Sequence, residues 1–277
     1  LQRSLSHTDR TISHLARILS TPNGIDTTLL TLCYTLTLLH ARLSTHLSTH
    51  LSQLASDIAS KASTALLPGE TIIASLPTPP RIARLLALQR GAKSLADLIA
   101  DYRIFFRLWG MVGIWAWARG VLASPPRDGV VRRLVWAQIA VNVPYQVLEN
   151  MAYLAQHGVL SGPRWDEKRQ LRLWCWSSMF WAADVALVFA RLGREWWVRM
   201  GEGKGKEGDG EKEDKLRERE RGEEDKRWWD EVIVNAAFAP LTIHWSLEEG
   251  LVSDAWVGLF GSIAGFVKFR ELWRSTA

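Results

Sequence analysis

The chain has 277 residues, 47% of them hydrophobic, and carries a formal net charge of +5 at neutral pH. This length and this apolar content fit one large domain or two small ones with a substantial core. Its two cysteines, Cys33 and Cys175, are too few for a disulfide framework. Its cations stand beside apolar helices rather than in a separate basic arm, which favours a lipid surface over nucleic acid as the partner.

Tryptophan is confined to the later part of the chain, because all 15 tryptophans lie at or after Trp109. The pairs at 196–197 and 228–229 bracket a run of charged residues and glycine. The indole ring favours the boundary between lipid and water, so this distribution predicts that the C-terminal part lies in or on a bilayer. Residues 198–227 would then form a hydrophilic loop between two interfacial anchors, with a short helix allowed over 211–221. A tryptophan-rich soluble core is the alternative.

Two helices are expected at the N-terminus. An apolar stripe over residues 5–19 predicts a short helix, which Pro22 and Gly24 end. Asp26 is then the expected N-cap of a long helix that reaches about Leu66. The apolar stripe of this helix, a candidate membrane-binding face, consists of Leu29, Leu32, Leu36, Leu39 and Leu43.

A basic amphipathic pattern follows a Pro-rich connector at 67–80. Apolar residues recur at steps of seven, three and four residues, which predicts a helix with one apolar face that begins in water and ends in a membrane or a bundle core. The expected membrane-binding residues of this face are Leu88, Leu95, Leu98, Tyr102, Phe105 and Trp109. The cations on the other side, expected to contribute to membrane binding, are Arg90, Lys93, Arg103 and Arg107.

Several later stretches are apolar, and the best candidate for a membrane span is 173–190, in which Asp184 is the only charge. Shorter or interrupted stretches lie at 108–118, 134–148, 232–247 and 255–267. A charge inside a span faces a partner or a polar pathway. We expect Asp184 to face an Arg, Asn or Ser side chain of a neighbouring helix, with a polar pathway as the alternative.

No strand pattern is present in the sequence, and the expected fold is an all-α, membrane-associated helical bundle with long amphipathic helices and short hydrophobic membrane helices. The expected organisation divides the chain into an N-terminal amphipathic region (1–66), a Pro-rich connector (67–80), a basic amphipathic helix (81–122), a membrane helical region (123–200), a charged flexible loop (201–227) and C-terminal membrane helices (228–277).

Gly258, Gly261 and Gly265 stand in an apolar C-terminal segment, and the last two are four residues apart. Small residues at this spacing let two membrane helices approach closely. The spacing predicts helix packing inside the monomer or self-association between copies, and it does not choose between them.

The sequence holds no Gly-rich phosphate loop, nucleophile elbow or Cys-rich metal pattern. His40, His46 and His50 share a region with no carboxylate or cysteine positioned to complete a metal site, and a solvated helix face explains them better. No enzymatic activity, cofactor or metal is therefore expected.

Four blocks together resemble the peroxisomal biogenesis factor 11 family, particularly its fungal form. They are HLARILSTPNG at 14–24 with the Leu-rich helix after it, RGAKSLADLIADYRIFFRLWG at 90–110, YQVLENMAYL at 145–154 and the Gly-rich stretch at 257–273. The resemblance implies a peroxisomal membrane protein whose amphipathic helices bend and elongate the membrane before fission. It also implies self-association and partnership with the organelle fission machinery.

One departure from the family pattern concerns the segment 27–43, which would match the membrane-bending helix. It carries only His40 and Arg42 as potential cations, so its attraction to anionic lipid is weak and the more basic 81–107 segment shares the role. The alternative function is a small-solute channel or transporter of the peroxisomal membrane, whose path would be lined by polar groups in or beside the apolar stretches: Asn142, Glu149, Asp184, Asn235 and His244.

Overall fold

A computed structural model describes residues 2–65, 79–202 and 211–276. These residues form helices and connecting turns without a strand, so the predicted all-α class is confirmed. The elements are α1 (Gln2–Leu19), α2 (Pro22–Ala65), α3 (Pro80–Phe106), η1 (Arg107–Trp109), α4 (Gly110–Ala123), α5 (Gly129–Gln156), η2 (Pro163–Trp165), α6 (Glu167–Glu202), α7 (Glu211–Ser246) and α8 (Asp254–Ser275).

The long helix α2 begins four residues before the predicted cap. The Oγ1 atom of Thr21 accepts a hydrogen bond from the backbone N–H of Gly24 at 3.1 Å, and Pro22 takes the first helical position. A hydroxyl cap followed by proline is a favoured helix start, because proline has no N–H to satisfy there. The prediction that Asp26 is the N-cap is wrong, and its carboxylate is free to reach another helix.

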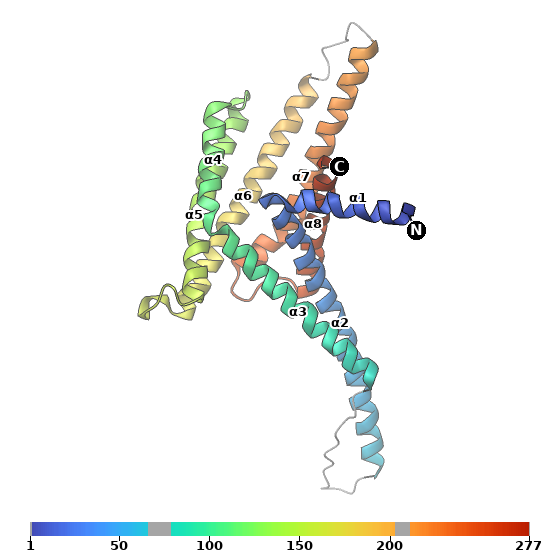
Figure 1. Ribbon diagram of the computed structural model, residues 1–277. Coiled ribbons are helices and arrows are strands. Elements are labelled where there is room, and N and C mark those ends of the chain that lie inside the picture. The colour runs from blue at the N-terminus through green and yellow to red at the C-terminus, as the bar shows by residue number, and fades with distance from the viewer. Residues whose placement is uncertain (1, 66–78, 203–210, 277) are drawn as a thin grey trace.

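The helices form a ring in which each packs on the next. Neighbouring pairs run α3–α2, α2–α8, α8–α7, α7–α6 and α6–α5, and α4 packs on the outside of α5. In Figure 1, α4 to α7 lie side by side, while α3 crosses in front of the bundle and extends away from it together with α2. Polar contacts between the end of α3 and α5 close the ring.

The largest hydrophobic cluster joins α2, α7 and α8. Its buried residues are Leu30, Val234, Ala237, Phe238, Leu241, Val257 and Ala264. A smaller cluster of Val121, Val131, Val135 and Ile139 holds α4 against α5. The core therefore lies at helix contacts and leaves large outward surfaces on α3 and α4.

The glycines of α8 lie against α2. A Cβ atom at Gly258 would stand 2.5 Å from the backbone nitrogen of Leu38, and one at Gly261 would stand 2.1 Å from the ring of Tyr34. At Gly265 the nearest α2 atom would be the Cα of Thr31, at 2.8 Å. These glycines thus permit close helix packing within one chain, the first of the two predicted uses.

The segment predicted as a hydrophilic loop at 198–227 is helical wherever the structure describes it. α6 continues to Glu202 and α7 begins at Glu211, so the helical part of this segment is longer than the short helix expected over 211–221. Contacts between the two helices explain the difference: Arg199 pairs with Asp225 at 3.3 Å, and the indole N–H of Trp228 donates to the carbonyl of Leu192 at 3.1 Å.

Candidate functional site: an apolar outer face and the polar junction behind it

The apolar stripe of α3 faces outward. Leu88, Leu95, Leu98, Tyr102, Phe105 and Trp109 are all exposed, with Leu98 at 66% and Trp109 at 60%. The surface continues over α4, where Val112 and Trp115 are each 64% exposed. We call these residues the outer face: Leu88, Leu95, Leu98, Tyr102, Phe105, Trp109, Val112 and Trp115. A water-soluble helix turns such a stripe toward its core, so an exposed apolar surface of this extent indicates an apolar environment or a partner.

The opposite side of α3 packs on α2 through small residues. Ala92 and Ala96 are 5% exposed and Ile99 is 6% exposed. The Sγ atom of Cys33 on α2 lies 3.4 Å from the carbonyl oxygen of Ala96. Alanine at the contact lets the helices approach closely, which places polar side chains farther along α3 beside α2 and α5.

Arg103 lies on this inner side and binds Asp26 of α2. Its Nε atom donates to Oδ1 of Asp26 at 2.8 Å, and its side chain is only 12% exposed. The phenol of Tyr34 also lies beside this guanidinium, and burial raises the pKa of Tyr34 to about 12. The displaced Asp26 therefore serves as an internal counter-ion instead of a helix cap.

Arg107 binds Glu149 of α5 through two hydrogen bonds. Nε lies 2.9 Å from Oε2 and Nη2 lies 2.7 Å from Oε1, a planar fork geometry that strengthens charged hydrogen bonds. The hydroxyl of Tyr145 donates to the same carboxylate at 3.1 Å. Asp26 and Glu149 thus pair with Arg103 and Arg107 on the inner side of α3, whereas the sequence predicted that these arginines contribute to membrane binding.

The predicted continuous helix over 81–122 is broken at η1. Amides of α5 satisfy the carbonyls at the break: Gln146 donates to the carbonyl of Arg107 at 2.9 Å, and Asn150 donates to that of Leu108 at 3.1 Å. A Cβ atom at Gly110 would stand 2.0 Å from Oε1 of Gln146. Glycine at this position therefore lets α5 reach the break, and we call these contacts, together with the Arg107–Glu149 pair, the polar junction.

The other predicted membrane residues occupy outer or intermediate positions. Arg90 and Lys93 are exposed, and Lys93 pairs with Asp97 four residues later at 2.9 Å. On α2, Leu32 and Leu39 are exposed, whereas the remaining residues of that stripe, Leu29, Leu36 and Leu43, are partly buried. The exposed apolar surface of α2 is thus smaller than that of α3.

Among the described residues, α6 is long and apolar enough to cross a membrane, judged by length and composition alone. It contains the predicted 173–190 stretch. Asp184 accepts a hydrogen bond from the amide of Asn142 at 2.9 Å, with Gln138 at 3.5 Å. The prediction that this carboxylate faces a polar partner on a neighbouring helix is confirmed.

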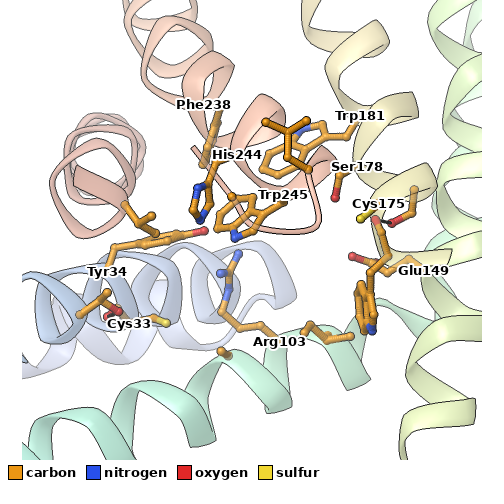
Figure 2. A pocket seen from close by; sticks show the side chains of 18 of the residues that line it. Cys33, Tyr34, Arg103, Glu149, Cys175, Ser178, Trp181, Phe238, His244 and Trp245 are labelled. Atoms are coloured by element: carbon orange, nitrogen blue, oxygen red, sulfur yellow. Dashed lines mark hydrogen bonds between the residues drawn. The ribbon is translucent and has the colours of Figure 1, made fainter. Parts of the chain in front are cut away.

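A cavity of about 730 Å³ lies inside the ring of helices. Figure 2 shows Arg103 and Tyr34 on one side, Trp181 and Trp245 above them, and Glu149 across from them. Of the polar groups suggested for a solute path, Glu149 and His244 line this cavity. Asn142 and Asp184 bind each other elsewhere, and Asn235 donates to the carbonyl of Glu231 on its own helix.

The fold and these surfaces define an all-α helical protein with a large exposed apolar face on α3 and α4. The chain belongs to the peroxisomal biogenesis factor 11 family, which it matches over residues 86–273. The matched region contains α4 to α7 entirely and most of α3 and α8. Membership gives the protein a role in peroxisome biogenesis and an association with peroxisomes.

A relative in Schizosaccharomyces pombe, described as an uncharacterized protein, is 30% identical over 187 residues. The similarity covers 67% of this chain and 78% of the relative. No solved structure matches the chain significantly.

Sequence reasoning did not identify the partners of the arginines. The signal was present in the 145–154 block, whose Tyr145, Gln146, Glu149 and Asn150 all contribute to the polar junction. This block and the 90–110 block were both part of the family resemblance, and the structure brings them into contact.

Proposed function

We propose that this protein binds the peroxisomal membrane through its outer face and bends and elongates that membrane, which promotes peroxisome fission and proliferation. The observation that carries the proposal is the inverted polarity of α3. Its leucines and aromatic residues face out, while Arg103 and Arg107 face in and are neutralised by carboxylates. The C-terminal half of such a helix can enter the acyl region without leaving Arg103 or Arg107 as an unpaired buried charge.

Insertion of the outer face supplies the energy for bending. Fully burying a large apolar side chain contributes about 1.5–3 kcal/mol relative to leaving it in water. A helix lying in one leaflet displaces headgroups and expands that leaflet relative to the other, which favours curvature. The exposed cations Arg90 and Lys93 at the start of α3 add attraction to anionic headgroups.

α6 is the proposed membrane anchor, and neighbouring surfaces support that role. Trp196 and Trp197 near its end are 48% and 67% exposed, and tryptophan favours the membrane interface. The Asp184–Asn142 hydrogen bond lowers the cost of placing this carboxylate of α6 in lipid. An anchor of this kind would hold the outer face at the bilayer and limit its depth.

Self-association and contact with the fission machinery complete the proposal. Many copies on one membrane would add their local curvatures into a tubule. Because the glycines of α8 are occupied by α2, copies would meet through other surfaces.

The test uses the full-length protein reconstituted with anionic liposomes and examined by electron microscopy. The variant Leu98→Asp/Phe105→Asp places two charges on the outer face. We expect it to abolish tubulation and to weaken liposome binding at least tenfold, since it removes apolar burial and adds a charge that must be desolvated. Tubulation at the wild-type level would overturn the proposal.

Two matched variants test whether a loss of tubulation comes from the lost apolar face. They distinguish it from the added charge and from unfolding of the protein. Ser52→Asp/Ser56→Asp adds the same two charges on exposed positions of α2 and should leave tubulation unchanged. Leu98→Met/Phe105→Leu keeps the outer face apolar and should also tubulate. In the same liposomes, conductance that changes in Asp184→Asn would favour the channel alternative.

A further inference from the structure

The cavity has the size and composition of a small-ligand site. Its volume of about 730 Å³ falls within the range of pockets that enclose drug-sized molecules. Six long helices contribute to its wall, α2, α3, α5, α6, α7 and α8, and η1 and the turn at 247–250 contribute as well. It lies on the inner side of α3, so an inference from it does not depend on the role of the outer face.

The charges around the cavity select the class of ligand. The arginines in its wall are already matched, Arg103 by Asp26 and Arg107 by Glu149. Glu248 and Glu249 also line the cavity, and neither forms an ion pair within the described part of the chain. The unmatched charge is therefore negative, which favours a cation over a fatty-acid carboxylate or another anion.

The acidic turn is held in place by a neighbouring side chain. The Nδ1 atom of His244 accepts hydrogen bonds from the backbone N–H groups of Leu251 at 2.7 Å and Val252 at 3.1 Å. Gly250 has a φ of 71°, and a Cβ atom there would stand 2.4 Å from the His244 ring. The protein itself therefore holds the turn with both glutamates in one conformation, and no ligand is needed to set it.

Aromatic rings form the wall beside this turn. Trp181 and Trp245 stack with ring centroids 5.6 Å apart, and Phe238 packs at 5.5 Å from Trp181. Trp174 also lines the cavity. Tryptophan faces attract ammonium groups, above all quaternary ammonium groups that carry their own apolar methyls.

One hydroxyl that lines the wall has no hydrogen-bond partner among the described residues. Ser178 is 8% exposed and forms no hydrogen bond with any described residue. Its side chain points into the cavity in Figure 2. Because this hydroxyl faces the cavity and is not bonded to the protein, a ligand oxygen in the cavity can accept a hydrogen bond from it.

We propose that the cavity binds the trimethylammonium-bearing headgroup of an amphiphile, such as a choline phospholipid. Glu248 and Glu249 attract the ammonium group, the tryptophan faces contact its methyls, and the hydroxyl of Ser178 donates to a phosphate or ester oxygen. The protein would thereby recognise an individual lipid molecule as well as a bilayer surface.

The experiment measures affinities by titration calorimetry with the full-length protein in amphipol and probes below their micelle concentrations. n-Decyltrimethylammonium should bind at least tenfold more tightly than n-decyl sulfate. Glu248→Gln/Glu249→Gln should weaken this binding at least fivefold, whereas Glu223→Gln/Glu224→Gln, which removes two exposed carboxylates of α7, should not. Equal or tighter binding of the sulfate, or unchanged affinity in Glu248→Gln/Glu249→Gln, would overturn the proposal.

Two further arms identify the source of the ammonium group and the role of the hydroxyl. If tetramethylammonium binds as tightly as the decyl probe, the ligand is a small free ammonium compound and the lipid assignment fails. Ser178→Ala should weaken n-decylphosphocholine at least threefold and leave n-decyltrimethylammonium unchanged, because the second probe has no phosphate. Equal effects on both probes would contradict the proposed contact of Ser178.

Discussion

Arg107 and Glu149 are 42 positions apart in the chain and join η1, directly after α3, to the C-terminal half of α5 through paired hydrogen bonds of 2.9 and 2.7 Å. The carboxylate is 6% exposed and the guanidinium 34% exposed. This contact closes the ring of helices and sets where the outer face lies relative to α6. Its loss should therefore affect both the stability of the protein and the position of the face.

We predict that Glu149→Gln destabilises the protein by about 2–3 kcal/mol. Breaking a buried pair leaves an uncompensated charge and costs about 3–5 kcal/mol, and the partial exposure of Arg107 reduces that figure. Thermal unfolding in detergent measures the change. The control is Glu195→Gln, because Arg191 retains Glu231 as a second partner. An equal loss of stability in both variants would show that the Arg107–Glu149 pair contributes no more to stability than the Arg191–Glu195 pair.

Gly110→Ala should destabilise the protein by about 1–3 kcal/mol, because the added methyl overlaps Oε1 of Gln146. The shift also threatens the hydrogen bond from Gln146 to the carbonyl of Arg107. Gly113→Ala is the matched control on the same helix, since no atom lies within 4 Å of its Cβ, and it should be neutral or slightly stabilising. Chemical denaturation compares the two, and a harmless Gly110→Ala would mean that α5 does not approach the break closely.

Gly258→Ala distinguishes the two predicted uses of the α8 glycines. Its Cβ would stand 2.5 Å from a backbone atom of α2, which cannot rotate away, so we expect a loss of about 1–3 kcal/mol or more. Gly193→Ala on α6, with no atom within 4 Å, is the control. A variant that unfolds normally but forms smaller particles by light scattering would instead assign Gly258 to self-association.

The start of α5 should respond to acid. Hydrogen bonds from Arg194 and from the N–H groups of Val131 and Val130 lower the pKa of Asp128 to about 2. The folded pKa lies below the ordinary value near 3.9, so the stabilisation is present above about pH 4 and is lost as the pH falls toward 2. Hydrogen exchange of the first turn of α5 measures this. Asp128→Asn retains the acceptor without the charge and should show no such pH dependence.

The sequence was sufficient to predict features that depend on neighbouring residues. The all-α class, the short first helix and the apolar stripe of α3 follow from periodicity, and a polar partner for Asp184 follows from the cost of a lone charge in an apolar segment. The sequence was not sufficient to predict which side chains of distant segments contact each other. Arg103 meets Asp26 across 77 positions, and nothing within either helix reveals which side chain will be opposite.

The errors at element ends have the same cause. The break after Phe106 depends on Gln146 and Asn150, which come from another helix. The helical part of the charged 198–227 segment is supported by contacts with the partner helix, including that of Trp228 with Leu192. Only the misplaced start of α2 was readable locally, because Thr21 followed by Pro22 is a stronger start signal than Asp26.

The orientation of α3 makes the surrounding medium part of the folding equilibrium. In water, the exposed apolar side chains of α3 would favour a rotation of this helix that buries them. The Arg103–Asp26 contact would have to break to allow that rotation. In a bilayer, the apolar side chains and the Arg103–Asp26 contact would both favour the same orientation of α3. If the outer face meets lipid as proposed, the native arrangement should be most stable in a host that accepts hydrocarbon, and its measured stability should vary with the micelle, amphipol or lipid chosen.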